Sequence, residues 1–187
     1  MRPLRTFPFP LNVGTDICQI SRIYRILSGT RARRFVNRIL APEELACNDA
    51  RLHVLTRASK VLSDGKPAGA SSIVATLKEG QQLHEELAAR DPDLWKCSAF
   101  IAGRFAAKEA AIKAHSHRQL TFHDVVIERR AVEGERLGSG PPVARIKSSQ
   151  ESDEADDSAM VSISHDGDYA TAVCLGHDPD LNREKVM

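Results

Sequence analysis

The sequence lacks the patterns that mark several classes of protein. No stretch approaches the roughly 20 uninterrupted apolar residues of a membrane-spanning helix, so no membrane span is expected. No cysteine pair has the CxxC spacing of a zinc or redox site, and nothing resembles a secretory signal peptide. We therefore predict free, mostly buried thiols in a reducing compartment. The four cysteines are Cys18, Cys47, Cys97 and Cys174.

Two nucleotide-binding signatures and internal repeats are also missing. Neither GxxxxGK[ST] nor GxGxxG occurs, which argues against an ordinary nucleoside triphosphatase or a dinucleotide-binding fold. The chain does have 187 residues, of which 42% are hydrophobic and 27% charged, enough for one domain with a real core. Its net charge of +1 indicates no particular partner, and no nucleic-acid partner is expected.

This small net charge conceals an uneven distribution. Residues 1–42 hold eight arginines, no lysine and a single acid, Asp16, whereas QESDEADDS near the end carries five acids and no base. The acidic run is typical of a solvated loop, and Arg2 and Arg5 weakly resemble an organelle-targeting leader. Helical periodicity predicts an arginine-rich face, for which an acidic partner and an ordinary solvated face are both plausible. It comprises Arg22, Arg25, Arg31, Arg33, Arg34 and Arg38.

Periodicity predicts helices first and strands last, which is the order of an α+β domain with helices packed on a small antiparallel sheet. We expect one domain over residues 1–187, with an insertion at about 46–97 and an acidic loop at about 148–158. An extended stretch at 10–13 should precede helices at 16–26, at 31–40, from Pro42, within 73–96, and from Ser98, as N-cap, to about His115. Strands are predicted at 123–128, 143–146, 160–164 and 169–175.

Three groups of residues could carry chemistry. Glu109 and Lys113 share one helix face, with Arg104 and Lys108 on the adjoining face. Asp16, expected at a helix start, could cap amides or hold an ion, and His165 at a strand end could cap a hairpin. The Glu–Lys spacing is also that of a common surface pair. Taken together, two carboxylates and a lysine suggest a Mg²⁺ site that takes its other ligands from substrate phosphates and water.

Five segments resemble, in order, the holo-acyl-carrier-protein synthase family of 4'-phosphopantetheinyl transferases: VGTDICQISRI, RFVNRILAPEE, FIAGRFAAKEAAIKA, RQLTFHDVVIERR and VSISHDGDYATAV. The resemblance covers roughly residues 12–44 and 98–175. It implies the transferase fold and Mg²⁺-dependent transfer of phosphopantetheine from coenzyme A to a serine of an apo acyl carrier protein, releasing adenosine 3',5'-bisphosphate. The alternative is a non-catalytic adaptor that binds carrier protein. Such an adaptor would not need the two carboxylates and the lysine to be present together.

The resemblance also assigns roles to residues. It implies that Asp16 and Glu109 hold the metal and, with Lys113, form the catalytic set. The implied coenzyme A-binding residues are Lys113, His165, Arg104 and Lys108, and the implied docking residues for the acidic carrier protein are Arg22, Arg31 and Arg34. The general base stays open between Glu109, Asp16 acting through a water, and another water.

Assembly and location follow from the same resemblance. The small, single-copy type is similar to homotrimers with active sites between neighbouring subunits, so we expect a homotrimer. The insertion and the longer acidic turn depart from the compact family pattern and suggest a eukaryotic organellar member. We therefore expect a mitochondrial location, with the cytoplasm as the alternative. Nothing in the sequence selects one carrier protein.

Overall fold

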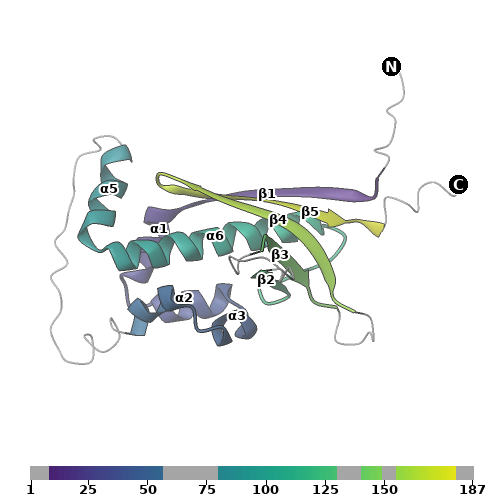
Figure 1. The fold of residues 1–187 in the computed structure, drawn as a ribbon, viewed down its shortest axis with the longest axis horizontal. Helices are drawn as coiled ribbons and strands as arrows, with labels where there is room; N and C mark the ends of the chain where they lie inside the picture. Colours follow the sequence, from purple (N-terminus) through teal and green to yellow (C-terminus); the bar gives the residue numbers. More distant parts are fainter. Residues whose placement is uncertain (1–8, 57–79, 130–139, 149–154, 180–187) are drawn as a thin grey trace, which may run out of the picture.

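The structure is a computed structural model that describes residues 9–56, 80–129, 140–148 and 155–179. A strand, a group of short helices, one long helix and four further strands follow one another (Figure 1), which confirms the predicted α+β class. The elements are β1 (Leu11–Gln19), α1 (Ile20–Leu27), α2 (Ala32–Ile39), α3 (Pro42–Ala46), the 3₁₀ helix η1 (Ala50–Leu52), α5 (Gly80–Arg90), α6 (Pro92–Ala114), β2 (Val125–Arg129), β3 (Pro142–Ile146), β4 (Asp157–Asp166) and β5 (Tyr169–His177).

The five strands form one antiparallel sheet in the order β1-β5-β4-β3-β2. The first and last strands pair along their full lengths, from Leu11 opposite His177 to Gln19 opposite Tyr169. Gly167 makes the tight β4–β5 turn with a φ of 52°, a conformation that favours glycine. All four strands predicted after residue 120 are present, at slightly different bounds.

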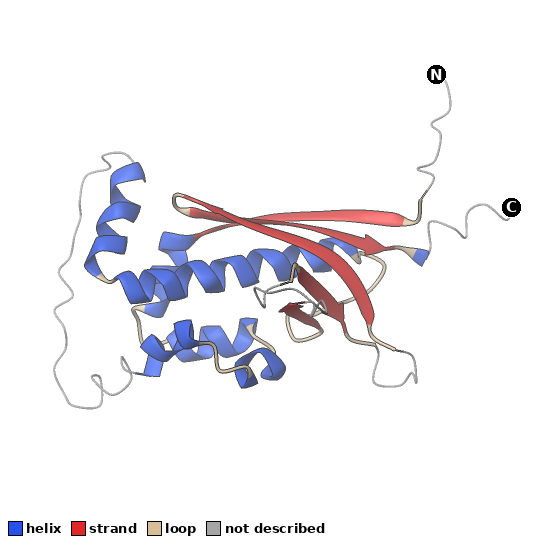
Figure 2. Ribbon diagram, in the orientation of Figure 1, coloured by secondary structure: helices blue, strands red, loops and turns tan. Residues whose placement is uncertain are grey.

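Helix α6 lies along one face of the sheet (Figure 2) and contributes a buried stripe of alanines to the core. Small side chains let β1 approach the helix backbone. A Cβ atom added to Gly14 would lie 1.9 Å from the carbonyl oxygen of Ala110 and 2.7 Å from the backbone nitrogen of Ala114. Only glycine fits at this crossing, which fixes β1 against the last turns of α6.

Two predicted helix starts are wrong. Residues 16–19 belong to β1 and α1 begins at Ile20, so Asp16 lies in a strand rather than at a helix start. Alternation along the strand turns Gly14 and Cys18 inward and leaves Ile17 exposed. Helix α6 begins at Pro92, where the Asp91 side chain caps the backbone N–H of Leu94.

The predicted cap for that helix is instead an interior residue. Ser98 is buried within α6, and its hydroxyl donates to the carbonyl oxygen of Leu94. The helix is therefore about two turns longer at its start than the sequence indicated. The prediction at 31–40 is confirmed by α2, and the one from Pro42 by α3.

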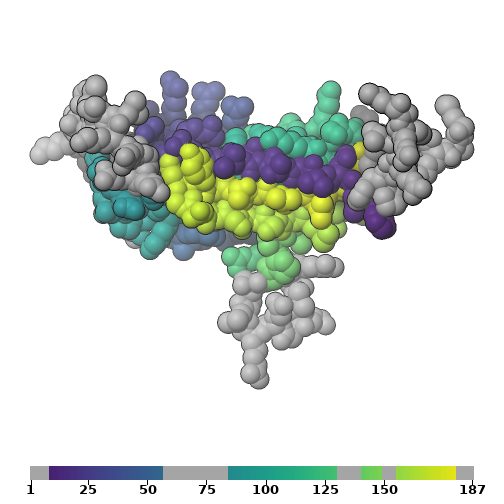
Figure 3. Space-filling view, turned by 90° about the horizontal axis from the view of Figure 1, so that it is seen from above, coloured from purple at the N-terminus to yellow at the C-terminus, as the bar shows by residue number. Residues whose placement is uncertain are grey.

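The outer face of the sheet carries large apolar side chains. Strands β1, β4 and β5 expose them at alternating positions, and the three strands run side by side across one surface (Figure 3). Met160 is 66% exposed and Val13 is 65% exposed. Several large apolar side chains exposed on one face are typical of an interaction surface. Its members are Leu11, Val13, Ile17, Met160, Tyr169 and Val173.

The predicted insertion and acidic loop are only partly described. Of residues 46–97, the described part holds η1, α5 and the beginning of α6, while the first residues of the helix predicted within 73–96 lie outside it. Most of the acidic loop also lies outside the described residues, and Asp157 and Ser158 open β4. Among the described residues, no helix is long and apolar enough to cross a bilayer. All four cysteines are free, and Cys47 alone is exposed.

Candidate active site

Asp16 and Lys113 form the centre of the predicted catalytic group. The Lys113 ammonium donates to Asp16 Oδ1 at 2.7 Å and to the carbonyl oxygen of Thr15 at 3.0 Å. Asp16 Oδ2 is buried and has no hydrogen-bond partner within the described part of the chain. A buried carboxylate oxygen without a donor is costly, so this atom is suited to receive a cation or a further donor.

Glu109 lies one turn before Lys113 on the same face of α6, and its side chain is half-buried. Residues at this spacing have Cβ atoms about 5–6 Å apart. Because Lys113 reaches Asp16, Glu109 belongs to the same small area of surface. The structure thus brings Asp16 and Lys113 of the predicted catalytic set into contact and places Glu109 one helical turn from Lys113.

These side chains fit a Mg²⁺ ion that keeps much of its hydration. In the described ranges, no group of three or more His, Cys, Asp or Glu side chains could hold a metal ion. Mg²⁺ is commonly bound through one or two carboxylates together with waters and substrate phosphates. Asp16, with its unpartnered buried oxygen, and Glu109 match that requirement.

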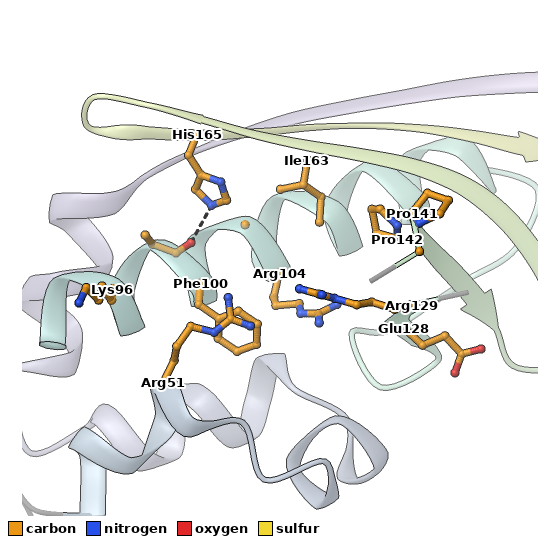
Figure 4. A pocket seen from close by; sticks show the side chains of 13 residues that line it. Arg51, Lys96, Phe100, Arg104, Glu128, Arg129, Pro141, Pro142, Ile163 and His165 are labelled. Atoms are coloured by element: carbon orange, nitrogen blue, oxygen red, sulfur yellow. Dashed lines mark hydrogen bonds between the residues drawn. The ribbon is translucent and has the colours of Figure 1, made fainter. Parts of the chain in front are cut away.

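His165 lies nearer the start of α6 than the catalytic group does, over the stretch from Ala99 to Gly103. Its Nε2 donates to the carbonyl oxygen of Ala99 at 3.0 Å (Figure 4). A Cβ atom at Gly103 would lie 2.9 Å from the same nitrogen, so the glycine makes room for the ring. With Nε2 donating, Nδ1 is the ring nitrogen left to face solvent or a ligand.

A pocket of about 580 Å³ opens beside His165 (Figure 4). Phe100 lies within it, with the guanidinium of Arg51 3.9 Å and that of Arg104 5.1 Å from the centre of its ring. Lys96 and Arg129 also line the pocket, and Glu128 is the acid in its lining. The excess of cations over acids suits an anionic ligand.

Sequence reasoning identified Arg104 and His165 in this pocket and missed the others. Lys96, Phe100 and Arg104 repeat every four residues, so they share one face of α6, and this spacing could have identified them. Arg51 carried no such signal because it lies outside the segments that resemble the family.

Arg104 and Lys108 share the helix face that points toward α3 and β2, but their environments differ. Arg104 donates to the carbonyl oxygen of Ile127 at 2.6 Å and still lines the pocket. Lys108 is fully buried, pairs with Glu44 and donates to the carbonyl oxygen of Phe122 at 2.8 Å. Burial lowers the pKa of Lys108, an effect that Glu44 opposes. The assignment of Lys108 to coenzyme A binding is therefore corrected, because its ammonium lies in the core.

Of the three predicted docking arginines, Arg22 lies nearest in the chain's contacts to the catalytic group. Arg22 is exposed on α1, donates to Cys18 Sγ at 3.5 Å, and has its guanidinium 5.6 Å from the centre of the Phe105 ring. Phe105 is one turn before Glu109, so this arginine adjoins the carboxylate site. Arg31 and Arg34 are exposed at the start of α2.

The catalytic group and the pocket are separated within one chain. Ten residues separate Gly103, against His165, from Lys113, so the two contacts are about 15 Å apart along the helix axis. One chain therefore presents two partial sites, one with carboxylates and one with cations.

Comparison with known proteins identifies the class to which this fold and site belong. No family model matches the chain. The chain is 30% identical to 4'-phosphopantetheinyl transferase B, mitochondrial, of Aspergillus fumigatus, over 90% of this chain and 95% of that protein. It is 31% identical to the holo-[acyl-carrier-protein] synthase of Bacillus pumilus, over 87% of this chain and 92% of that protein.

A solved structure agrees at the level of the fold. The crystal structure of the holo-acyl-carrier-protein synthase from Plasmodium yoelii has a TM-score of 0.51 and 20% identity, covering 89% of this chain and 94% of that one. The chain has the fold and sequence of a phosphopantetheinyl transferase. It belongs to the holo-[acyl-carrier-protein] synthase family, which confirms the resemblance and enzyme class predicted from the sequence.

Proposed function

We propose that this chain transfers the 4'-phosphopantetheine of coenzyme A to a serine of an apo acyl carrier protein. The serine oxygen attacks the β-phosphorus and forms a phosphodiester, and its proton passes to the general base. The bond from that phosphorus to the bridging oxygen breaks and releases adenosine 3',5'-bisphosphate. The observation that carries the proposal is the unpartnered, buried Asp16 Oδ2, whose carboxylate contacts Lys113 one turn from Glu109, in a chain of this family.

The residues of the catalytic group have separable tasks. Asp16 and Glu109 would hold Mg²⁺, which supplies charge neutralisation at the pyrophosphate. Lys113, held by the Thr15 carbonyl oxygen and half exposed, places a positive charge where the leaving phosphate develops negative charge. The serine is brought into line by docking of the carrier protein, so much of the rate comes from orientation.

We also propose that the working form is a homotrimer in which two chains complete each site. The catalytic group of one chain would face the Arg104 and His165 pocket of its neighbour, which accounts for two partial sites about 15 Å apart on one helix. The apolar outer face of the sheet supports the assembly, because a surface of this kind is commonly covered by a partner.

Mixing two inactive variants tests the shared site. Asp16→Asn and His165→Ala should each abolish transfer when alone. When they are unfolded together and refolded as a mixture, some sites receive an intact half from each chain, and activity returns. A single-chain site predicts no recovery in the mixture. Light scattering of the native protein measures whether three chains assemble.

The carrier protein is proposed to dock through an acidic helix on Arg22, Arg31 and Arg34, which are all exposed. We propose a mitochondrial location, with the cytoplasm as the alternative. Two observations support the mitochondrial location: the mitochondrial name of the Aspergillus fumigatus relative and the arginine-rich start of the chain.

Intact-mass measurement tests the proposed reaction directly. The protein is incubated with apo acyl carrier protein, coenzyme A and Mg²⁺, and the carrier protein is weighed. We expect the mass to rise by one phosphopantetheine in the complete mixture and to stay unchanged with chelator. Carrier protein that binds but gains no mass would identify an adaptor and overturn the enzyme proposal.

A further inference from the structure

The segment between α3 and α6 contributes a cation to the pocket beside His165, although it lies outside the parts of the chain that resemble the family. Arg51, in η1, comes from the start of this segment. On the basis of the proposed function, we infer that Arg51 is a substrate-binding residue that recognises the 3'-phosphate of coenzyme A and selects against coenzyme A lacking that group.

The geometry of Arg51 is fixed before any ligand arrives. Its Nε donates to Asp49 Oδ1 at 2.8 Å and its Nη2 to Asp49 Oδ2 at 2.6 Å, so one carboxylate clamps two donors. The backbone N–H of Arg51 donates to the same carboxylate at 3.0 Å. The flat guanidinium lies 3.9 Å from the centre of the Phe100 ring. A clamped and stacked guanidinium loses little freedom when it binds an anion.

The clamp also leaves donors unused. Asp49 takes the Nε and Nη2 edge, and Nη1 has no hydrogen-bond partner in the described parts of the chain. The Arg51 hydrogen bonds hold the pKa of Asp49 down at about 2, so its carboxylate stays charged at neutral pH and keeps the clamp closed. An incoming anion therefore meets Nη1 without having to displace Asp49.

The pocket has a deficit of negative charge. Arg51 and Arg104 stack near the same ring, and Lys96 and Arg129 add two cations. Glu128 is the acid in the lining, and Asp49, which pairs with Arg51, offsets one of these four cations. Like charges gathered on one small surface repel each other, and a dianion removes that repulsion.

The chemistry of coenzyme A indicates which anion this is. Its pyrophosphate contains the reacting phosphorus and must lie at Asp16, Glu109 and Lys113. The phosphate group that remains is the 3'-phosphomonoester, a dianion whose oxygens match the donors of a guanidinium. In the proposed shared site, the pocket of one chain faces the catalytic group of the next, so a single coenzyme A can reach both.

Comparison of coenzyme A with 3'-dephospho-coenzyme A tests this inference. Arg51→Gln should lower kcat/KM for coenzyme A by about tenfold, the effect of losing one charge-assisted hydrogen bond. It should leave kcat/KM for 3'-dephospho-coenzyme A within about twofold of wild type, since that substrate offers no phosphate for Arg51. Arg51→Lys should recover part of the preference for coenzyme A over 3'-dephospho-coenzyme A. Arg90→Gln, which removes an exposed arginine from the same segment, should change neither value.

Two outcomes would overturn the inference. An equal loss with both substrates would make Arg51 structural, and no loss with either would place the 3'-phosphate elsewhere. Calorimetric binding of both compounds, without carrier protein, reports on the pocket independently of turnover. A wild-type protein that binds coenzyme A with the expected Arg51 dependence but transfers nothing would refute the proposed function and leave this inference standing. If wild-type protein transfers phosphopantetheine normally and Arg51→Gln keeps the wild-type preference for coenzyme A over 3'-dephospho-coenzyme A, the proposed function stands and this inference is refuted.

Discussion

The ammonium of Lys113 lies 2.7 Å from Asp16 Oδ1, while the second oxygen of the same carboxylate is buried without a hydrogen-bond partner in the described residues. Strand β1 and helix α6 meet at this pair. The close contact of Gly14 with the turn from Ala110 to Ala114 fixes the strand on the helix only two residues away. Asp16 therefore has little freedom to move relative to Glu109 and Lys113.

Removing either carboxylate should abolish metal-dependent transfer. Asp16→Asn and Glu109→Gln keep the size of the side chain but remove its charge, so we expect kcat/KM to fall by about 100-fold or more at saturating Mg²⁺. Titration of Mg²⁺ against the initial rate measures the effect. Thr15→Ala is the matched control, because Lys113 contacts only the backbone carbonyl oxygen of this residue. Near-normal activity in Glu109→Gln would refute the metal assignment.

Reversing one docking charge should affect carrier protein and coenzyme A differently. Arg22→Glu is expected to raise KM for the carrier protein by about tenfold and to leave KM for coenzyme A close to wild type. The effect should shrink as salt is added, because exposed charges are screened. Arg22→Lys keeps the charge and serves as control. Equal changes in both Michaelis constants would contradict a docking role.

Glu44 and Lys108 should behave as a structural pair. Glu44→Gln leaves the buried ammonium of Lys108 without a charged partner, and we expect the free energy of unfolding to fall by about 3–5 kcal/mol. Lys108→Met should cost less, because Glu44 keeps the backbone N–H of Ala41 as a donor and lies near Arg104. Urea denaturation gives both values.

The same variant checks the corrected role of Lys108. Lys108→Met should leave KM for coenzyme A within about twofold of wild type, since the ammonium lies in the core. A large rise in that constant at unchanged stability would return Lys108 to the binding site.

The cysteines should divide into one reactive and three protected thiols. Burial raises the pKa of Cys97 to about 12 and that of Cys174 to about 11, and it also raises the pKa of Cys18. In folded protein at pH 8, iodoacetamide should label Cys47 alone, because thiolates react and the other three remain protonated and covered. Unfolding in urea should expose all four. Mass spectrometry counts the labels, and labelling of a second cysteine in folded protein would contradict the buried assignment.

The sequence predicted most elements near the site but could not place Asp16 correctly. The apolar residues Ile17, Ile20 and Ile23 satisfy a helical pattern, yet Ile17 is exposed on the outer face of the sheet. Strand β1 exists because it pairs with β5, about 150 residues later in the chain, and local periodicity carries no information about that pairing.

Long-range contacts also explain why neighbouring cationic residues differ in burial. Arg104 and Lys108 lie one turn apart on the same helix face, so the sequence does not distinguish them. Lys108 is buried because α3 packs beside it and Glu44 pairs with its ammonium. In contrast, Glu109 and Lys113 could be grouped from sequence, because their relation lies within one helix. Arg51 could not be found, since only the packing of η1 on Phe100 brings it to the pocket.

The pairing of β1 with β5 has a consequence for synthesis of the chain. In the sheet, β1 is an edge strand whose neighbour is β5, which the ribosome makes more than a hundred residues later. Long-range strand pairing of this kind forms late in folding. A nascent chain that stops before Tyr169 can form α6 with Glu109 and Lys113, but it has no neighbouring strand to hold Asp16 in place. We therefore expect the carboxylate pair to assemble only on a nearly complete chain.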